Sequence, residues 1–251
     1  MVSGKNTVQL VVRIVNDIRR NYNNNKVTVV ALLDIEKAFD RIWIDGLIYK
    51  MFSGAYPSII IRLIYSYLSN RTLRVKVNNN KSLPRSIKAG VPQGSVLGPQ
   101  LFNIYINPFL YQTFISIYLF ADDTAIYAHS FSAIVAAKQV QIHVDLLQRY
   151  YNKWKITLNT EKTETIVFAR KTKDTRIIQP IQIYNNIRQI KTMVKYLGVN
   201  LESKLTYKIH IKTVLRKTYS VMKQLYPLMA KGSALSSYNK LLIYKMILRP
   251  I

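Results

Sequence analysis

Phe120-Ala121-Asp122-Asp123 is the stretch that decides the fold, because it places two adjacent carboxylates between two apolar runs, residues 115–120 and 124–128. Adjacent Asp residues repel each other, and β-strands disfavour Asp. A tight turn between two strands tolerates such a pair, and divalent cations bound there would make it useful. The stretch therefore predicts a β-hairpin with carboxylates at its turn.

The distribution of acidic residues gives the second signal. Half of the 12 Asp and Glu residues fall in two short segments, as Asp34, Glu36, Asp40, Asp45, Asp122 and Asp123. The rest of the chain is strongly basic, with 37 Lys and Arg and a formal net charge of +25. This pattern is typical of a metal site inside a surface that binds a polyanion.

The composition bounds the class of protein. A chain of 251 residues with 49% hydrophobic content can bury a sizeable core, as one large domain or two modest ones. A pI near 10.1 points to nucleic acid or an anionic membrane surface. The 18 Tyr residues suit a surface that stacks on bases as well as a core. The absence of Cys excludes disulfides, thiol chemistry and Cys-zinc sites.

Residues 89–121 carry no charge and raise the question of a membrane. Pro, Gln and Asn interrupt the stretch throughout, whereas a spanning helix needs about 20 predominantly apolar residues. We interpret it as buried interior. The first residues lack the apolar region of a signal peptide. We therefore expect no membrane partner and an intracellular protein, nuclear or cytoplasmic.

Periodicity predicts the elements along the chain. Helices are expected near residues 6–22, 44–68 with a break at 54–57, 100–111, 135–154 and from 205 onward. Strands are expected at 27–33, 73–77, 83–89, 115–120, 124–128, 163–169 and 193–199, with a polar connection between the last two. The apolar run at 27–33 is typical of a strand buried on both faces, and it ends at Asp34.

Asp34 ends one strand, and Asp122 and Asp123 cap a hairpin. If these strands are neighbours in one sheet, three carboxylates converge. Such clusters select hard cations such as Mg²⁺, and two ions about 3.5–4 Å apart can clamp the attacking and leaving oxygens of phosphoryl transfer. An isolated Asp-Asp pair would usually indicate a solvated turn. The apolar flanks of this pair, and Asp34 at the end of another apolar strand, indicate a metal site instead.

Five motifs carry a resemblance to a known family. Residues 34–40 (DIEKAFD), 89–99 (AGVPQGSVLGP) and 120–123 (FADD) resemble the three catalytic motifs of reverse transcriptases. Residues 158–163 (LNTEKT) and 196–199 (YLGV) resemble the two segments that follow, the second at the entry to the thumb. The similarity is closest to polymerases of jockey-like non-LTR retrotransposons, and it covers nearly the whole chain in the family's order and spacing.

The resemblance implies roles residue by residue. Asp34, Asp122 and Asp123 match the metal-binding catalytic aspartates, and Phe39 matches the aromatic gate that excludes a ribose 2′-hydroxyl. Gln93 and Gly94 match the loop near the incoming nucleotide and template. Lys162 matches a catalytic lysine proposed to protonate the pyrophosphate leaving group. Glu36, Asp40 and Asp45 are expected to make local salt bridges or caps instead of binding metal.

The implied fold is α+β, a polymerase right-hand palm whose antiparallel sheet is flanked by helices and followed by a helical thumb. We expect a residual finger segment at 1–24, the palm at 25–190 and a partial thumb at 191–251. The implied cofactors are two Mg²⁺ ions, or Mn²⁺ in their place. The implied partners are an RNA template, a DNA primer, deoxynucleoside triphosphates, and finger and other domains of a longer element protein.

Residues 191–251 hold 12 Lys and Arg against Glu202 alone, which suits a grip on the primer–template backbone without sequence readout. The finger motifs that hold the triphosphate are not recognisable here, so the isolated chain is expected to bind primer–template but to extend it poorly. Two alternatives stay open. One is a catalytically impaired or domesticated nucleic-acid-binding remnant, and the other is a metal-dependent nuclease using the same three Asp.

Overall fold

The computed structural model describes residues 7–107, 116–120, 123–170 and 178–250. The chain divides into two compact units, Met1–Lys191 and Thr192–Ile251. This division lies beside residue 190, where the sequence predicts a boundary. Each unit is described by itself below.

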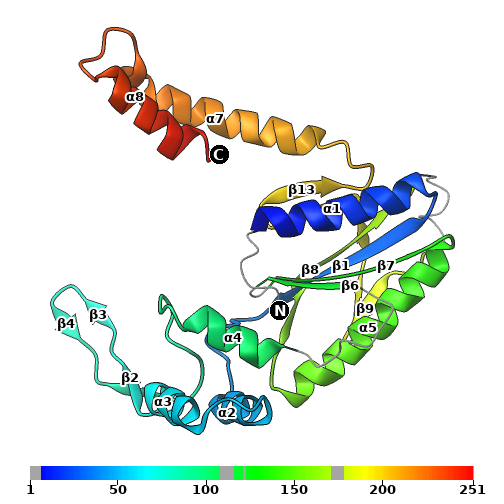
Figure 1. Ribbon diagram of the computed structural model, residues 1–251, viewed down its shortest axis with the longest axis vertical. Coiled ribbons are helices and arrows are strands. Elements are labelled where there is room, and N and C mark those ends of the chain that lie inside the picture. Colours follow the sequence, from blue (N-terminus) through cyan, green and yellow to red (C-terminus); the bar gives the residue numbers. More distant parts are fainter. Residues whose placement is uncertain (1–6, 108–115, 121–122, 171–177, 251) are drawn as a thin grey trace. The chain divides into compact units, whose positions relative to one another are not determined.

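A five-stranded sheet is the centre of the first unit (Figure 1). Its strand order is β11 (Ile190–Lys191), β8 (Leu158–Phe168), β1 (Val27–Ile35), β7 (Asp123–Ser130) and β6 (Ser116–Phe120). The pairs are antiparallel except β11 with β8, which is parallel. The central strand β1 is buried on both faces, as its apolar run predicts. The predicted mixed fold with an antiparallel sheet and flanking helices is confirmed.

Helices cover the two faces of this sheet (Figure 1). α5 (Ala133–Lys153) packs on one face, where its buried residues join alternate residues of β1 in the main core, including Val29, Ala31, Val140, Val144 and Tyr151. α1 (Thr7–Asn23) buries Leu10, Ile14 and Ile18 and is tied to β7 by a hydrogen bond of 2.8 Å from the Tyr127 hydroxyl to Asp17. Since side chains alternate along a strand, the residues of β1 and β7 that share the face of Tyr127 lie on the α1 side.

Three helices of the first unit lie in the connection between β1 and β6. They are α2 (Ile44–Ser53), α3 (Ser58–Leu68) and α4 (Gly98–Ile106). The break between α2 and α3 falls at the predicted Gly-Pro segment. α4 buries Leu101, Phe102, Tyr105 and Ile106 in the core, as expected for the charge-free stretch, while residues 108–115 lie outside the described part. No helix among the described residues has the length and apolar character needed to cross a bilayer.

The sequence-based assignment is wrong in detail between residues 71 and 89. Two continuous strands, at 73–77 and 83–89, are expected there. The structure has four short ones: β2 (Arg71–Leu73), β3 (Lys76–Val77), β4 (Asn80–Lys81) and β5 (Arg85–Ile87). β2 pairs with β5 and β3 pairs with β4. Pro84 has no N–H to donate, and residues 72–86 are all exposed, so no buried face holds the strands continuous.

Other differences lie after α5. β8 begins at Leu158, earlier than the predicted residue 163, and the expected polar connection contains β9 (Ile181–Ile183), β10 (Asn186–Arg188) and β11. The strand expected at 193–199 is a hairpin of β12 (Met193–Tyr196) and β13 (Val199–Glu202). Its two turn residues, Leu197 and Gly198, both have positive φ, as a two-residue type I′ turn requires.

The second unit continues into α7 (Lys208–Met229), α8 (Ser237–Ile243) and a π-helical turn, η1 (Tyr244–Leu248). None of these three helices buries a side chain in the described structure. Exposed apolar residues follow α7 at helical spacing, including Leu215, Tyr219, Met222 and Tyr226. The helical and basic pattern from residue 205 therefore produces helices whose apolar stripe is largely open.

Lys50 is enclosed by three aromatic residues where α2, α4 and α5 meet. Its ammonium lies 5.1 Å from the ring centre of Tyr105, 4.7 Å from that of Tyr150 and 4.2 Å from that of Trp154. It also donates to the Tyr105 carbonyl and the Tyr150 hydroxyl. Burial lowers the pKa of Lys50 to about 7, while the ring faces act in the opposite direction because they favour the cation.

This burial predicts a pH-dependent stability. Because the pKa of Lys50 is lower in the folded than in the unfolded chain, the unfolded chain binds the extra proton between about pH 7 and 10.5. The free energy of unfolding of the wild type should therefore rise across that window relative to Lys50→Met, by more than about 1 kcal/mol. Urea unfolding of both proteins at several pH values measures the difference. Parallel pH profiles would show that Lys50 keeps an ordinary pKa.

Candidate active site

The register of the central sheet brings the two described aspartates of the candidate site together. β1 and β7 are neighbours, with Leu33 opposite Thr124. Asp34 and Asp123 are the next residues after this pair on their strands, and Asp123 is the partner of Phe120 in the β6–β7 hairpin. Residues directly opposite in an antiparallel pair project from one face of the sheet, and the next residue on each strand projects from the other face. Both carboxylates therefore belong to the α1 side of the sheet.

Asp122, the third aspartate of the predicted set, lies outside the described residues. Within the described ranges there is no group of three Asp, Glu, His or Cys residues that could hold a metal. The three-carboxylate site consequently stays a prediction, with Asp34 and Asp123 on neighbouring strands of one sheet.

An irregularity in β8 shapes the other side of Asp34. Asp34 is opposite Asn159, whereas Leu32 is opposite Glu164, so β8 carries three more residues than β1 over this interval. The Asn159 side chain accepts hydrogen bonds from the backbone N–H groups of Glu161 and Lys162, at 3.1 and 3.2 Å. These bonds hold the extra residues in a bulge, and bulges re-aim side chains near active sites. The bulge directs Lys162 into the same pocket as Asp34.

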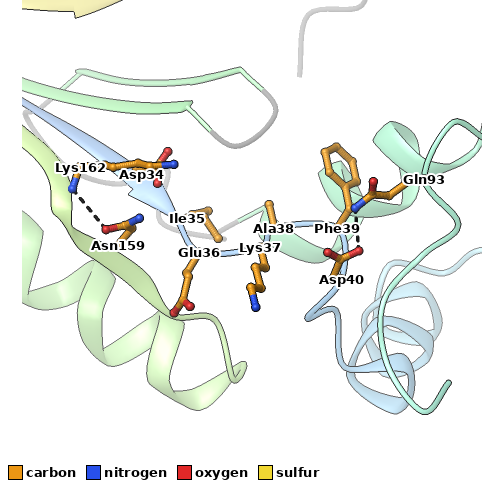
Figure 2. A pocket seen from close by; sticks show the side chains of 10 residues that line it. All are labelled: Asp34, Ile35, Glu36, Lys37, Ala38, Phe39, Asp40, Gln93, Asn159 and Lys162. Carbon is orange, nitrogen blue, oxygen red and sulfur yellow. Dashed lines mark hydrogen bonds between the residues drawn. The ribbon is translucent and has the colours of Figure 1, made fainter. Parts of the chain in front are cut away.

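The pocket has a volume of about 420 Å³. Figure 2 shows Asp34, Asn159 and Lys162 on one side of it and Phe39, Asp40 and Gln93 on the other, with residues 35–38 between them. Four predicted site residues, Asp34, Phe39, Gln93 and Lys162, therefore line one cavity. Asp123 and Gly94 are not among its lining residues.

Gln93 reaches the pocket because its loop is fixed to the segment that follows β1. The N–H of Gly90 donates to the Ile42 carbonyl and the N–H of Val91 to the Phe39 carbonyl, each at 2.8 Å. The Gln93 amide then donates to the Asp40 carboxylate at 2.8 Å. Asp40, expected to form a local salt bridge or cap, instead orients Gln93, which is distant in sequence.

Two glycines of this loop have positive φ for different reasons. Gly90 has φ +81°, and a Cβ there would lie 2.6 Å from the Asp40 carbonyl oxygen, inside backbone. Gly94 has φ +78°, and a Cβ there would meet nothing within 4 Å. Gly90 therefore permits the close approach of two chain segments, whereas Gly94 leaves open space above the loop for another molecule.

Phe39 is half-buried, and its ring packs on Phe102 of α4 with centroids 5.2 Å apart. This packing fixes the ring while part of it lines the pocket. Two other acidic residues near the site, Glu36 and Asp45, interact with their local surroundings. Glu36 pairs with Arg41 at 3.0 Å, and Asp45 sits in the first turn of α2, where a negative charge is favourable.

The donor set suits a hard divalent cation. Asp34 and Asp123 offer carboxylate oxygens from the same face of adjacent strands, and a cation would offset the repulsion between them. Mg²⁺ is typically bound by one or two carboxylates and keeps several waters, so it does not need a cage made wholly of protein groups. Asp34 is half-buried beside the pocket, which leaves room for such waters and for a phosphate.

Comparison with known proteins identifies the family of this chain. Residues 1–201 match the family model described as reverse transcriptase (RNA-dependent DNA polymerase). The chain belongs to the reverse transcriptase family. A curated relative in this family is the RNA-directed DNA polymerase from mobile element jockey of Drosophila melanogaster, 33% identical over 95% of the chain and 26% of the relative. The probable polymerase from transposon BS of the same fly is 32% identical over 99% of the chain and 28% of the relative.

The resemblance to reverse transcriptases of jockey-like elements is thereby confirmed. This reverse transcriptase chain spans about a quarter of the length of those relatives. Among solved structures, telomerase from Candida tropicalis in complex with a fragment of telomeric RNA aligns with a TM-score of 0.57 over 96% of this chain and 41% of the telomerase chain. The sequence identity is 15%, so this likeness shows the right-hand polymerase fold alone.

Proposed function

We propose that this chain is the palm and part of the thumb of an RNA-directed DNA polymerase that adds deoxynucleotides to a primer. The observation that carries the proposal is the pocket that Asp34, Phe39, Gln93 and Lys162 line together, with Asp123 on the strand next to that of Asp34. Family membership supports a nucleic-acid template and nucleotide substrates. Reverse transcriptases generally depend on divalent metal, and in the proposal Asp34, Asp122 and Asp123 hold two Mg²⁺ ions, or Mn²⁺ in their place.

The bound metals would supply activation of the primer 3′-hydroxyl and charge stabilisation of the triphosphate. The chain's own residues do the rest. Asp34, on the buried central strand, would hold a metal ion at a fixed place relative to the sheet. Lys162, held by the bulge, donates a proton to the leaving pyrophosphate. Gln93, oriented by Asp40, contacts the nucleotide or template through its amide. Gly94 has no side chain, so the nucleic-acid strand can approach the protein backbone of this loop.

Primer extension tests the proposal. An oligo(dT) primer on a poly(rA) template with dTTP and Mg²⁺ is incubated with the chain alone and with the chain joined to the flanking segments of the jockey polymerase. Positioning supplies much of the rate in phosphoryl transfer, so we expect strong extension by the longer protein and little by the short one. A longer protein that folds and binds the primer–template but never extends it would contradict the proposed activity.

Phe39 should set the choice between deoxynucleotides and ribonucleotides. Its ring is fixed on Phe102 at the pocket wall, so an added 2′-hydroxyl would meet a rigid surface. Phe39→Ala should reduce the preference for dTTP over UTP by about 10- to 100-fold, mainly through better use of UTP. Phe39→Tyr keeps the ring and should keep the preference. Equal discrimination by wild type and Phe39→Ala would remove Phe39 from the nucleotide site.

A further inference from the structure

Residues 71–88 form an exposed ribbon, called the basic arm here, that extends away from α3 (Figure 1). It contains six Lys and Arg residues and no Asp or Glu. Every residue from 72 to 86 is exposed, so the arm has no core of its own. A two-stranded ribbon without a packed face is only marginally stable in water. Neither the pocket described above nor the basic thumb segment accounts for this arm.

The pairing within the arm opposes its own folding. Lys76 and Lys81 are directly opposite each other in the β3–β4 ladder. Their side chains therefore project from the same face, and like charges in this position are destabilising. In the described structure no acidic side chain forms a salt bridge with either lysine. Two cations held side by side at the end of a ribbon suit a phosphate, which would remove their repulsion.

A pocket with aromatic lining residues lies at the root of the arm. Arg71 fixes the root, because its guanidinium donates to the carbonyls of Leu68, Ala89 and Gly90. The pocket has a volume of about 600 Å³, and its lining includes Trp43, Tyr65 and Lys88. The Lys155 ammonium covers the Trp43 ring at 4.2 Å from its centre, whereas Tyr65 is exposed. Cations along a groove with aromatic faces are the combination that binds single-stranded nucleic acid.

The course of the chain connects the arm to the candidate active site. β5 ends at Ile87, and the chain continues directly into the loop that contains Gly90 and Gln93. A nucleic-acid strand bound along the arm would therefore extend toward the loop that contains Gln93, which lines the pocket.

We propose that the basic arm and its root pocket bind single-stranded nucleic acid, with Lys76 and Lys81 binding a phosphate and Tyr65 offering a ring face to a base. This inference rests on the proposed function, since it supplies a path for the unpaired strand. The partner is recognised by its phosphates and its stackable bases, so RNA and DNA are both accepted at this surface.

The test is the salt dependence of binding to a labelled single-stranded RNA, measured by fluorescence anisotropy for the full chain. Lys76→Gln/Lys81→Gln removes two cations, so the slope of log affinity against log salt should fall by about 1.4. Its thermal midpoint should stay the same or rise, because the repulsion between the two lysines is also removed. The matched control is Lys138→Gln/Lys153→Gln on α5, which has the same charge change on exposed lysines and should keep the wild-type slope.

The outcomes separate the arm from the wider proposal. Identical slopes for the arm variant and the α5 control, with steep binding by the wild type, would overturn the arm proposal and leave the polymerase assignment standing. A wild-type chain with no salt-dependent binding would overturn both. If the wild type binds polyglutamate as tightly as RNA and the arm variant loses both, nucleic acid is not the partner that the arm recognises.

Discussion

Asp34→Asn or Asp123→Asn should reduce template-directed nucleotide addition by about 10³-fold or more. The substitutions are made in the chain joined to the flanking segments of the jockey polymerase, for which we expect strong extension. Both residues present carboxylates from one face of adjacent strands, and Asn removes the negative charge while keeping the shape. A metal ion contributes several kcal/mol to stabilising the transition state of phosphoryl transfer, and ~4 kcal/mol corresponds to about 10³-fold in rate. Initial rates of dTTP incorporation measure the loss.

The control for charge alone is Asp145→Asn on α5, an exposed carboxylate that accepts a hydrogen bond from Gln141. It should keep the wild-type rate. Mn²⁺ binding, followed by electron paramagnetic resonance, gives a readout that does not depend on turnover. Asp34→Asn and Asp123→Asn should weaken Mn²⁺ binding, and Asp145→Asn should not. Undiminished metal binding and activity in both site variants would place the metal elsewhere.

Gly90→Ala should destabilise the first unit by ~3 kcal/mol or more. The new Cβ would lie 2.6 Å from the Asp40 carbonyl oxygen and 2.8 Å from its Cα, and these backbone atoms are fixed by hydrogen bonds on both sides. The positive φ adds strain for any residue with a side chain. Urea unfolding, together with hydrogen exchange of the amides of residues 90 and 91, measures the effect.

Gly94→Ala is the matched control, because Gly94 has nearly the same φ but an added Cβ there meets nothing within 4 Å. It should lose only about 1–2 kcal/mol, from backbone strain alone. The difference between the two variants isolates the close approach of Gly90 to Asp40. Equal losses in the two proteins would show that the loop can move away from Asp40 without penalty.

Some features of the fold follow from local sequence. The apolar run of residues 27–33 predicts the doubly buried central strand, and the Gly-Pro segment at 54–57 predicts the break between α2 and α3. These predictions succeed because burial on two faces and helix termination each leave a pattern within a few residues. The breaks at 74–75 and 82–84 are not predictable from the sequence, because an exposed ribbon lacks the burial that makes alternation informative.

Lys50 shows the limit of reading burial from residue type. In sequence it is one lysine in an amphipathic helix, and a solvated position is the ordinary expectation. The rings that enclose it, Tyr105, Tyr150 and Trp154, come from α4, α5 and the residue that follows α5. Only the packing of three helices brings them together.

By itself, the sequence determined the motifs and their order, the strand that ends at Asp34, the acidic turn and the basic background, because each is a property of residues near one another in the chain. Tertiary structure decided which of these groups meet. The pairing of β1 with β7 brings Asp34 and Asp123 to neighbouring strands, the bulge in β8 directs Lys162 into the pocket, and Gly90 lets Asp40 orient Gln93. Strand register and backbone approach are long-range contacts, which local periodicity does not encode, so the geometry of the candidate site emerged only when the chain was folded.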